Sequence, residues 1–269
     1  MGYTAHMRDQ VIVITGASGG IGAALAERVA RAGGVAVLAA RREPELEVVR
    51  ARCGERAIAV VADVTRRADV QRLLDRALER HGHVDVWVNN AGRGISRTVS
   101  QLSEGEFDEM IDVNLRSALH GMQVALSHFK TRRRGHIINV SSMLGRVPYV
   151  PWRSAYSAAK HALNALTASL RLELRSEYPE IHVSTVSPGV VATEFGVHAL
   201  GGGPDSRTLP GSQPVEEVAE TIAAVIERPR ADTYTQPGHR QMVVDYFAAE
   251  DMGEVESQPP FLTPRPVAR

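Results

Sequence analysis

The sequence predicts an α/β protein, a doubly wound three-layer sandwich whose sheet is mostly or wholly parallel. Short β-branched runs alternate with longer segments of helical pattern from about residue 10 to residue 235. The short runs are apolar on both faces, as parallel strands are when helices cover them from both sides. The first run also leads directly into a glycine-rich stretch, which is typical of the first strand-to-helix turn in such folds.

Each element follows from a local pattern. The apolar runs predict strands over residues 10–15, 35–40, 57–62, 84–89, 135–140 and 182–187. The segments between them predict helices over about 20–32, 44–53, 66–81, 106–131 and 154–177. A later helix is expected over 215–227, because Pro214 and the two glutamates after it suit a helix N-terminus.

No linker and no internal repeat divides the chain, so we expect a single domain over residues 8–255. Residues 194–214 are expected to form a mobile lid, because they include a long stretch rich in Gly, Pro and Ser. The tail 256–269 carries four prolines and is expected to be extended or disordered. The residues before Arg8 are assigned no role in the fold.

The composition argues against several classes of partner. Lys plus Arg and Asp plus Glu both total 31, so nothing indicates binding to nucleic acid or to an anionic membrane. No apolar run approaches the ~18 residues of a membrane helix, and no signal-peptide core is present. The single cysteine, Cys53, fits a reducing cytoplasm. The ten histidines lack metal-ligand spacing, so no metal site is expected.

The stretch TGASGGIG, residues 15–22, follows the first predicted strand. A glycine-rich turn there brings backbone N–H groups and the positive end of a helix up to a phosphate. Gly16 suits the tight turn, Gly20 the close approach of a pyrophosphate, and Gly22 the packing of helix on strand. Ser18 and Ile21 belong to the same candidate dinucleotide site. The alternative is an ordinary glycine-rich turn.

The residues at the end of the second strand determine whether the dinucleotide carries a 2′-hydroxyl or a 2′-phosphate. A carboxylate there would accept hydrogen bonds from a ribose 2′-hydroxyl and repel a 2′-phosphate. This chain has Ala40 at that point, followed by Arg41 and Arg42. Guanidinium groups bind phosphate through paired, charge-assisted hydrogen bonds, so these residues predict NADP(H). The alternative is a pair of solvated arginines at a helix entrance.

Polar and small residues also follow the third and fourth strands. Asp63 and Val64 end the third strand, where a short acid could hydrogen-bond an adenine edge. The stretch NNAG follows the fourth strand, and its small residues would let the chain pass beneath a cofactor; we include Asn90, Ala91 and Gly92 in the site. Both stretches could be simple turns. They gain weight because ligands of open α/β sheets bind at the carboxyl ends of strands.

Together these motifs resemble the short-chain dehydrogenase/reductase family, in its non-extended form. The resemblance runs through TGASGGIG, ADV, NNAG, VNL (113–115), INVSS (138–142), YSAAK (156–160) and SPGVVAT (187–193). It implies a Rossmann-like fold with seven strands and an NADP(H)-dependent oxidoreductase that interconverts a carbonyl and a secondary alcohol. It also implies a homodimer or homotetramer packed through helices 106–131 and 154–177.

The same resemblance assigns the acid/base to Tyr156. A free phenol has a pKa of ~10 and is a poor base at neutral pH. Lys160 lies one helical turn away on the same face, and its ammonium, with the positive nicotinamide, would favour the phenolate. Lowering the pKa by ~3 units requires roughly 4 kcal/mol. The resemblance also has Lys160 hydrogen-bond the nicotinamide ribose. The alternative is a surface Tyr–Lys pair.

Ser142 matches the family's serine that hydrogen-bonds the substrate oxygen. Its spacing to Tyr156 is 156 − 142 = 14, one more than the family usually shows. We place the extra residue in the loop 146–153, because its two prolines mark a segment that absorbs an insertion better than a strand end does. Ser141 is the competitor, expected on the opposite face of the strand.

Five further positions match by resemblance. Asn114 matches an asparagine that helps to hold a water linked to the lysine, and a mid-helix Asn needs some compensating contact. The turn after the sixth strand supplies the remaining cofactor contacts, with Thr193 at the nicotinamide carboxamide or phosphate; its residues are Pro188, Gly189, Val191 and Thr193.

Other functions remain open from the residues. A regulator that binds the cofactor and senses the redox ratio without turnover is one, an NAD(H)-dependent dehydrogenase of the same fold is a second, and an epimerase or lyase on the same scaffold is a third. The substrate is a small carbonyl or alcohol compound that the sequence does not identify. Tyr149 and Trp152 suggest a hydrophobic or ring-containing substrate, whereas Arg153 and His198 could meet a polar group.

Overall fold

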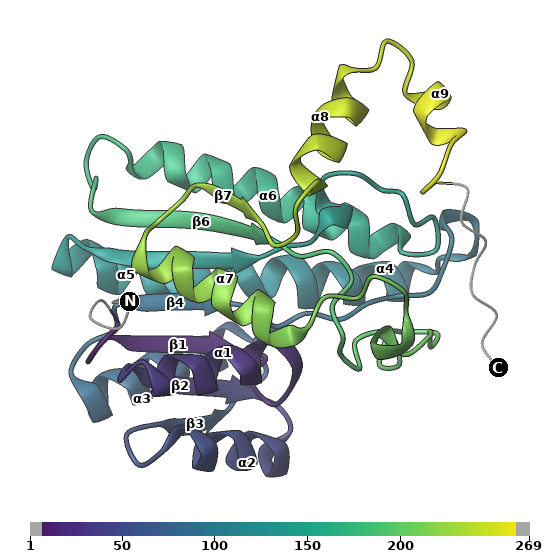
Figure 1. Cartoon of the computed structure of the whole chain (residues 1–269). Helices are drawn as coiled ribbons and strands as arrows, with labels where there is room; N and C mark the ends of the chain where they lie inside the picture. Colours follow the sequence, from purple (N-terminus) through teal and green to yellow (C-terminus); the bar gives the residue numbers. More distant parts are fainter. Residues whose placement is uncertain (1–6, 262–269) are drawn as a thin grey trace.

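Seven parallel strands form the sheet in the computed structural model, which describes residues 7–261 of the chain (Figure 1). The strands are β1 (Val11–Thr15), β2 (Val35–Ala40), β3 (Ile58–Val61), β4 (Val86–Asn89), β5 (Gly135–Val140), β6 (Ile181–Ser187) and β7 (Asp232–Tyr234). Their order is β3-β2-β1-β4-β5-β6-β7, and every pairing is parallel. The predicted fold class is confirmed. The order reverses between β1 and β4, and such a reversal opens a crevice at the carboxyl ends of the strands.

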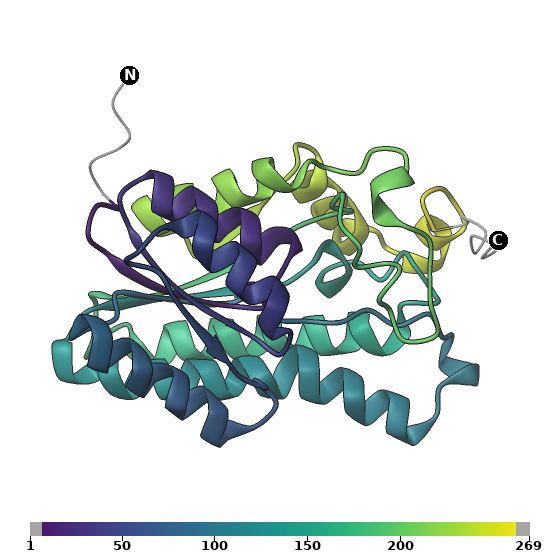
Figure 2. The same cartoon turned by 90° about the horizontal axis from the view of Figure 1, so that it is seen from below.

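The helices cover both faces of this sheet. They are α1 (Gly20–Arg31), α2 (Glu43–Cys53), α3 (Arg67–His81), α4 (Glu104–Ile111), α5 (Ser117–Arg132), α6 (Ser154–Leu174), α7 (Val215–Glu227), α8 (His239–Ala248) and α9 (Met252–Glu256). Helices α1, α2 and α7 pack on one face, and α3, α5 and α6 pack on the other (Figure 2). The sequence pattern did not predict α8 and α9, because α8 buries only Tyr246 and α9 buries no side chain.

The helix predicted over 106–131 is interrupted. A π-helical turn, Asp112–Arg116, separates α4 from α5. Asn114 lies in this turn and is 1% exposed. Its side-chain amide donates to the carbonyls of Met110 (3.1 Å) and Arg93 (2.9 Å). These bonds compete with regular helical pairing, which explains why the helix widens at this residue.

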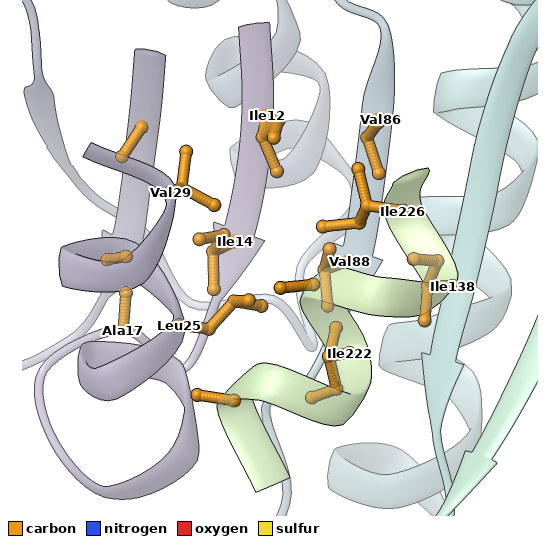
Figure 3. Packing of buried hydrophobic residues seen from close by; sticks show 14 of the residues in the cluster. Ile12, Ile14, Ala17, Leu25, Val29, Val86, Val88, Ile138, Ile222 and Ile226 are labelled. Carbon is orange, nitrogen blue, oxygen red and sulfur yellow. The ribbon is translucent and has the colours of Figure 1, made fainter. Parts of the chain in front are cut away.

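The core next to the crevice consists of branched apolar side chains. Ile12 and Ile14 of β1 and Val88 of β4 meet Leu25 of α1 and Ile222 of α7 (Figure 3). All five are fully buried, and each contributes roughly 1.5–3 kcal/mol by burial. This packing holds α1 against the carboxyl end of β1, where the glycine-rich turn lies.

The start of the described chain takes part in the core. Met7 was assigned no role, but its side chain is fully buried in the core beside α1. Its position follows from a short turn in which the Met7 carbonyl accepts from the Gln10 N–H (3.1 Å). Of the proline-rich tail, only residues 256–261 are described; 1–6 and 262–269 lie outside. Across residues 7–261, every helix is too short or too polar to cross a membrane.

Candidate active site

The glycine-rich turn lies against the segment that follows β4. Gly16 has φ +68°, and a Cβ added there would lie 2.8 Å from the Cα of Ala91. Thr15, the last residue of β1, accepts hydrogen bonds through Oγ1 from the N–H groups of Asn90 (3.0 Å) and Ala91 (3.1 Å). Thr15 was not predicted to matter. The sequence feature that could have identified it is its position at the end of the first strand, directly before the glycine-rich turn.

The start of α1 is free to meet an anion. The residue before the helix is Gly19, and among the described residues no side chain caps it. The first turn carries no acidic residue. A Cβ on Gly22 would lie 2.7 Å from Asn90 Nδ2, so only glycine lets α1 approach β1 and β4 this closely. The uncapped N–H groups and the positive helix end therefore face the crevice, which suits a phosphate.

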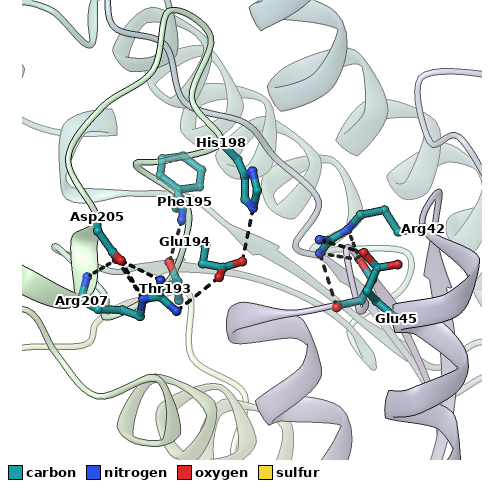
Figure 4. Close-up of polar contacts among 9 residues, drawn as sticks. Arg42, Glu45, Thr193, Glu194, Phe195, His198, Asp205 and Arg207 are labelled. Atoms are coloured by element: carbon teal, nitrogen blue, oxygen red, sulfur yellow. Dashed lines mark hydrogen bonds and ion pairs between the residues drawn. The ribbon is translucent and has the colours of Figure 1, made fainter. Parts of the chain in front are cut away.

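The side chains of the two predicted phosphate-binding arginines, Arg41 and Arg42, lie in different places. Arg42 reaches back to the glycine turn, where its Nη2 donates to Ser18 Oγ (3.2 Å) (Figure 4). It also pairs with Glu45 at 3.3 Å, and both side chains are about half exposed, so this ion pair is weak. Arg41 instead lines a cavity of about 380 Å³ between the β3 end and α4, together with Thr65, Arg93, Gly105, Asp108, Glu109, Asp112 and Val113.

Asp63 bends back onto its own turn. Its Oδ1 accepts from the Thr65 hydroxyl (2.8 Å) and from the Thr65 N–H (3.1 Å). Val64 packs against the core on the α3 and α5 side. The structure thus gives Asp63 the turn role that was the alternative to an adenine contact, and the adenine contact stays a prediction.

Gly92 marks a point where two predicted site residues meet. A Cβ placed on Gly92 would lie 2.8 Å from Asn114 Oδ1 and 3.7 Å from Lys160 Nζ. Asn114 Oδ1 also accepts from the Arg93 N–H (3.1 Å). The side chain of Asn114 therefore clamps the segment after β4, and this contact compensates for its place inside a helix.

Tyr156 and Ser142 lie next to each other despite the unusual spacing between them. Tyr156 comes in the first turn of α6 and is 7% exposed, and hydrogen bonding with the Ser142 side chain lowers the pKa of its hydroxyl. The irregular stretch 146–153 lies between the turn at Met143–Gly145 and α6. Ser141 points elsewhere, because its Oγ donates to the Lys160 carbonyl (3.5 Å).

Lys160 lies one turn further along α6 and is 3% exposed. Its Nζ donates to the Val140 carbonyl (2.9 Å) and lies 5.7 Å from the centre of the Tyr156 ring. Burial lowers the pKa of Lys160 to about 8, so the ammonium is the main form at pH 7.

In the protein by itself, burial governs the pKa of Tyr156. Burial raises the pKa of Tyr156 to about 12; the Ser142 hydrogen bond and then the charge of Arg153 offset part of that rise, whereas Tyr149 adds to it. The protein by itself therefore holds Tyr156 as a neutral phenol at neutral pH.

The turn after β6 extends from the catalytic region to the glycine turn. The Pro188 carbonyl accepts from the Met143 N–H (2.8 Å). Gly189 lies against α8, since a Cβ there would be 2.5 Å from His239 Cε1. Val191 is buried and bridges to Gln213. Thr193 reaches the glycine turn, with its methyl 3.3 Å from the position of a Gly20 Cβ.

The segment 194–214 lies down over Tyr156. Phe195 packs on the Tyr156 ring, with the ring centres 5.5 Å apart and edge to face. The Leu200 N–H donates to the Gly94 carbonyl (2.8 Å), which fastens this lid to the segment after β4. Exposed lid residues also contact one another (Figure 4): Glu194 contacts His198 and pairs with Arg207, and Asp205 pairs with Arg207. Phe195 was not predicted, because nothing in the sequence placed it over Tyr156.

The residues present fit a dinucleotide. The glycine turn, the uncapped start of α1 and the Arg42–Ser18 pair lie at one end of the crevice, and Tyr156 and Lys160 lie at the other. Thr193, on the turn after β6, lies against Gly20 of the glycine turn. By contrast, no group of three or more His, Cys, Asp or Glu side chains in the described part of the chain could hold a metal ion.

Comparisons with known proteins agree with this geometry. The family model for short chain dehydrogenases matches residues 10–199. The chain is 35% identical over 189 residues to an uncharacterized oxidoreductase of Staphylococcus epidermidis, which covers 70% of this chain and 81% of that protein. It is 40% identical over 193 residues to an uncharacterized oxidoreductase of Listeria innocua, which covers 70% of this chain and 77% of that protein.

Solved structures give the same result. A short chain dehydrogenase/reductase from Burkholderia phymatum in complex with NAD superposes with a TM-score of 0.83 and 28% identity, covering 97% of this chain and 99% of that one. An alcohol dehydrogenase from Thermococcus sibiricus complexed with 5-hydroxy-NADP superposes with a TM-score of 0.73 and 31% identity, covering 84% of this chain and 95% of that one.

Proposed function

The chain belongs to the short-chain dehydrogenase family, and from that premise we propose that it is an NADP(H)-dependent oxidoreductase that interconverts a carbonyl and a secondary alcohol. The observation that carries the proposal is the meeting of Ser142, Tyr156 and Lys160 at the carboxyl edge of the sheet, beside the glycine turn. The chemistry of hydride transfer needs a proton donor and an oxyanion-stabilising donor at one carbonyl oxygen, and these side chains supply both.

Each residue has a role in the proposal. A bound nicotinamide supplies or accepts the hydride. Tyr156, protonated at neutral pH, donates its proton to the carbonyl oxygen during reduction and takes it back during oxidation. Ser142 hydrogen-bonds the same oxygen, and the Lys160 ammonium favours the phenolate left on Tyr156. Asn114 holds the segment after β4 against Lys160 and, as proposed from the family, helps to hold a water there.

The preference for NADP(H) rests on charge. Arg42 meets Ser18 beside the uncapped helix start, and Ala40 leaves no carboxylate at the end of β2 to repel a 2′-phosphate. Arg41 lies next in the chain and is exposed. The relatives include one structure described with NAD and one with an NADP derivative, so NAD(H) is the alternative cofactor.

We also propose a homodimer or homotetramer. Its support is the outer surface of α6, where Leu172 is 68% exposed and Leu166 is 37% exposed. A second copy that packs on α6 and the neighbouring α5 would remove this apolar surface from water. Light scattering on the purified protein measures the mass directly.

The function is tested by a panel of carbonyl and alcohol compounds with NADPH and NADH, followed by nicotinamide absorbance. On any compound that reacts, Tyr156→Phe should lower kcat by ~10²- to 10⁴-fold, because it removes the proton donor. Cofactor affinity should remain. The matched control is Tyr178→Phe, which removes a hydroxyl that hydrogen-bonds with Glu177 and takes no part in the site.

Full turnover by Tyr156→Phe would contradict the mechanism. Tight cofactor binding without turnover of any compound in the panel would instead favour a redox-sensing regulator.

A further inference from the structure

Arg153 lies at the centre of the candidate substrate region. It immediately precedes α6, three residues before Tyr156. Its Nη1 donates to the Ile95 carbonyl (2.9 Å), and its guanidinium lies 6.0 Å from the centre of the Phe195 ring. The segment after β4, the lid and α6 therefore all meet at this one cation.

Glycines flank the guanidinium. A Cβ added to Gly94 would lie 2.7 Å from Nη1 of Arg153, and one added to Gly203 would lie 3.3 Å from Nη2. A side chain at Gly94 would collide with the guanidinium, and one at Gly203 would crowd it. The glycines leave room for the cation between the segment after β4 and the lid.

The positive charge of Arg153 has no carboxylate partner between residues 7 and 261. Nearby arginines differ in this respect: Arg97 pairs with Glu106 at 3.0 Å, and Arg146 pairs with Asp232 at 2.9 Å. Arg153 is partly buried, and burial lowers the pKa of its guanidinium. A partly buried cation without a counter-ion is costly, and a bound anion would offset that cost.

The guanidinium also lies close to the phenol, because Phe195 packs against both the Arg153 guanidinium and the Tyr156 ring. The charge of Arg153 lowers the pKa of Tyr156, which fits this proximity. Arg153 lies directly before α6, and Tyr156 lies in the first turn of that helix. A ligand whose carbonyl oxygen reaches Tyr156 would therefore carry any group bound by Arg153 only a few atoms away.

We propose that Arg153 binds a carboxylate of the substrate, so that this enzyme acts on oxo acids whose carboxylate lies one to three carbon atoms from the ketone carbon. A guanidinium and a carboxylate form two parallel hydrogen bonds, and Arg153 uses only one of its five N–H groups within the described chain. Phe195 adds ring surface beside it, which suits an aromatic oxo acid.

This inference rests on the proposed function, and the reaction is the same hydride and proton transfer to a ketone. The ketone carbon gains a hydride from NAD(P)H, the ketone oxygen gains the Tyr156 proton, and the carboxylate is unchanged. The products are a hydroxy acid and NAD(P)⁺, and water returns the proton to Tyr156. Arg153 is thus a specificity-determining residue.

The test uses matched pairs of substrates that differ only in charge. Phenylglyoxylate and 3-benzoylpropanoate are each compared with their methyl ester, and kcat/KM is measured for wild type, Arg153→Gln and Arg153→Lys. Wild type should prefer at least one acid over its ester by about tenfold or more, with Arg153→Gln removing that preference through KM. Arg153→Lys should retain part of it. Arg146→Gln removes a guanidinium that is already paired and should leave the acid-to-ester ratio within about twofold of wild type.

Binding is measured separately from turnover. Calorimetry with the protein and oxidised cofactor, which cannot reduce the ketone, should show the preferred acid binding about tenfold more weakly to Arg153→Gln than to wild type. An equal loss on acid and ester would mean that Arg153 only positions the lid, and it would overturn the proposal. Turnover of esters alone would overturn it while leaving the proposed function intact. Absence of turnover on a full carbonyl panel would overturn both.

Discussion

At the scale of single residues, burial sets the protonation states of the site. It raises the pKa of Tyr156 to about 12 and lowers that of Lys160 to about 8. Below about pH 8 the protein therefore holds a neutral phenol next to an ammonium, which is the pair that reduction of a carbonyl needs. Formation of the phenolate for alcohol oxidation requires further stabilisation, and the positive charge of an oxidised nicotinamide would add to that of Arg153.

The neighbouring serines allow a sharp comparison. Ser142→Ala should lower kcat by ~10- to 100-fold, because it removes the hydrogen bond at the Tyr156 hydroxyl. Ser141→Ala should have little effect on kcat, since its Oγ donates to the Lys160 carbonyl. Steady-state kinetics of the two variants measures this difference. A larger loss of kcat in Ser141→Ala than in Ser142→Ala would assign the substrate contact to Ser141.

Arg42 allows a test of the cofactor preference. Arg42→Ala should weaken NADPH binding by about tenfold or more and leave NADH binding nearly unchanged, because the guanidinium would meet only the 2′-phosphate. The control is Arg50→Ala, whose side chain pairs with Glu47 on the outer surface of α2. Fluorescence titration with both cofactors measures the change. An equal loss for both cofactors would mean that Arg42 holds the glycine turn rather than the phosphate.

At the scale of elements, a buried polar chain ties the helices to the sheet behind the site. Trp87 Nε1 donates to Asn89 Oδ1 (2.9 Å), Asn89 donates to Asn139 Oδ1 (2.8 Å), and Asn139 donates to Thr167 Oγ1 (2.8 Å). The chain thus runs from β4 across β5 to α6. Gly121 lets α5 lie close enough to cover it, since a Cβ there would collide with Asn89 Oδ1.

Alanine substitutions at two helical glycines distinguish the effect of packing on the free energy of unfolding from the effect of helix propensity. Gly121→Ala should lower the free energy of unfolding by about 3 kcal/mol, because the added methyl would force α5 away from Asn89 and Trp87. Gly105→Ala in α4 meets nothing within 4 Å and should be neutral or stabilise by up to about 1 kcal/mol. Urea unfolding measures both. A neutral Gly121→Ala would show that this contact relaxes without cost.

At the scale of the whole molecule, the parallel order brings distant segments to one edge. The carboxyl ends of β1, β4, β5 and β6 deliver the glycine turn, the NNAG segment, Ser142 and the Pro188–Thr193 turn to the same crevice. The opposite end of the sheet carries a different feature, the buried His136 of β5. Its Nε2 contacts Ser184 Oγ (2.8 Å), and its ring meets that of His182 edge to face.

His136 makes stability depend on pH. Burial, with a smaller contribution from His182, lowers the pKa of His136 to about 3. Below an unfolded-state pKa of about 6.5, only the unfolded chain takes up this proton, so the folded state loses stability as pH falls from about 6.5 towards 3. The loss attributable to His136 should reach about 2 kcal/mol at pH 5.

Urea unfolding at several pH values measures that loss. His136→Gln should flatten the dependence between pH 6.5 and 5, whereas His198→Gln, in the exposed lid, should keep the wild-type slope. An unchanged slope in His136→Gln would mean that other groups govern acid unfolding.

Much of the fold was readable from local patterns. The six predicted strands agree with the structure to within two residues at each end, and the helices on both faces agree nearly as well. The exceptions have physical causes. The helix predicted over 106–131 widens into a π turn because the amide of Asn114 takes contacts outside the helix, and α8 escaped prediction because it has no broad apolar stripe.

The sequence by itself determined the alternation of strands and helices, the glycine turn and the one-turn spacing of Tyr156 and Lys160, because each is a pattern within a few consecutive residues. Only the tertiary structure decided that Ser142 meets Tyr156 across the loop 146–153, that Phe195 covers the phenol and that Arg153 has no carboxylate partner in the described chain. Contacts and burial depend on where separate segments meet, and no local pattern contains that information.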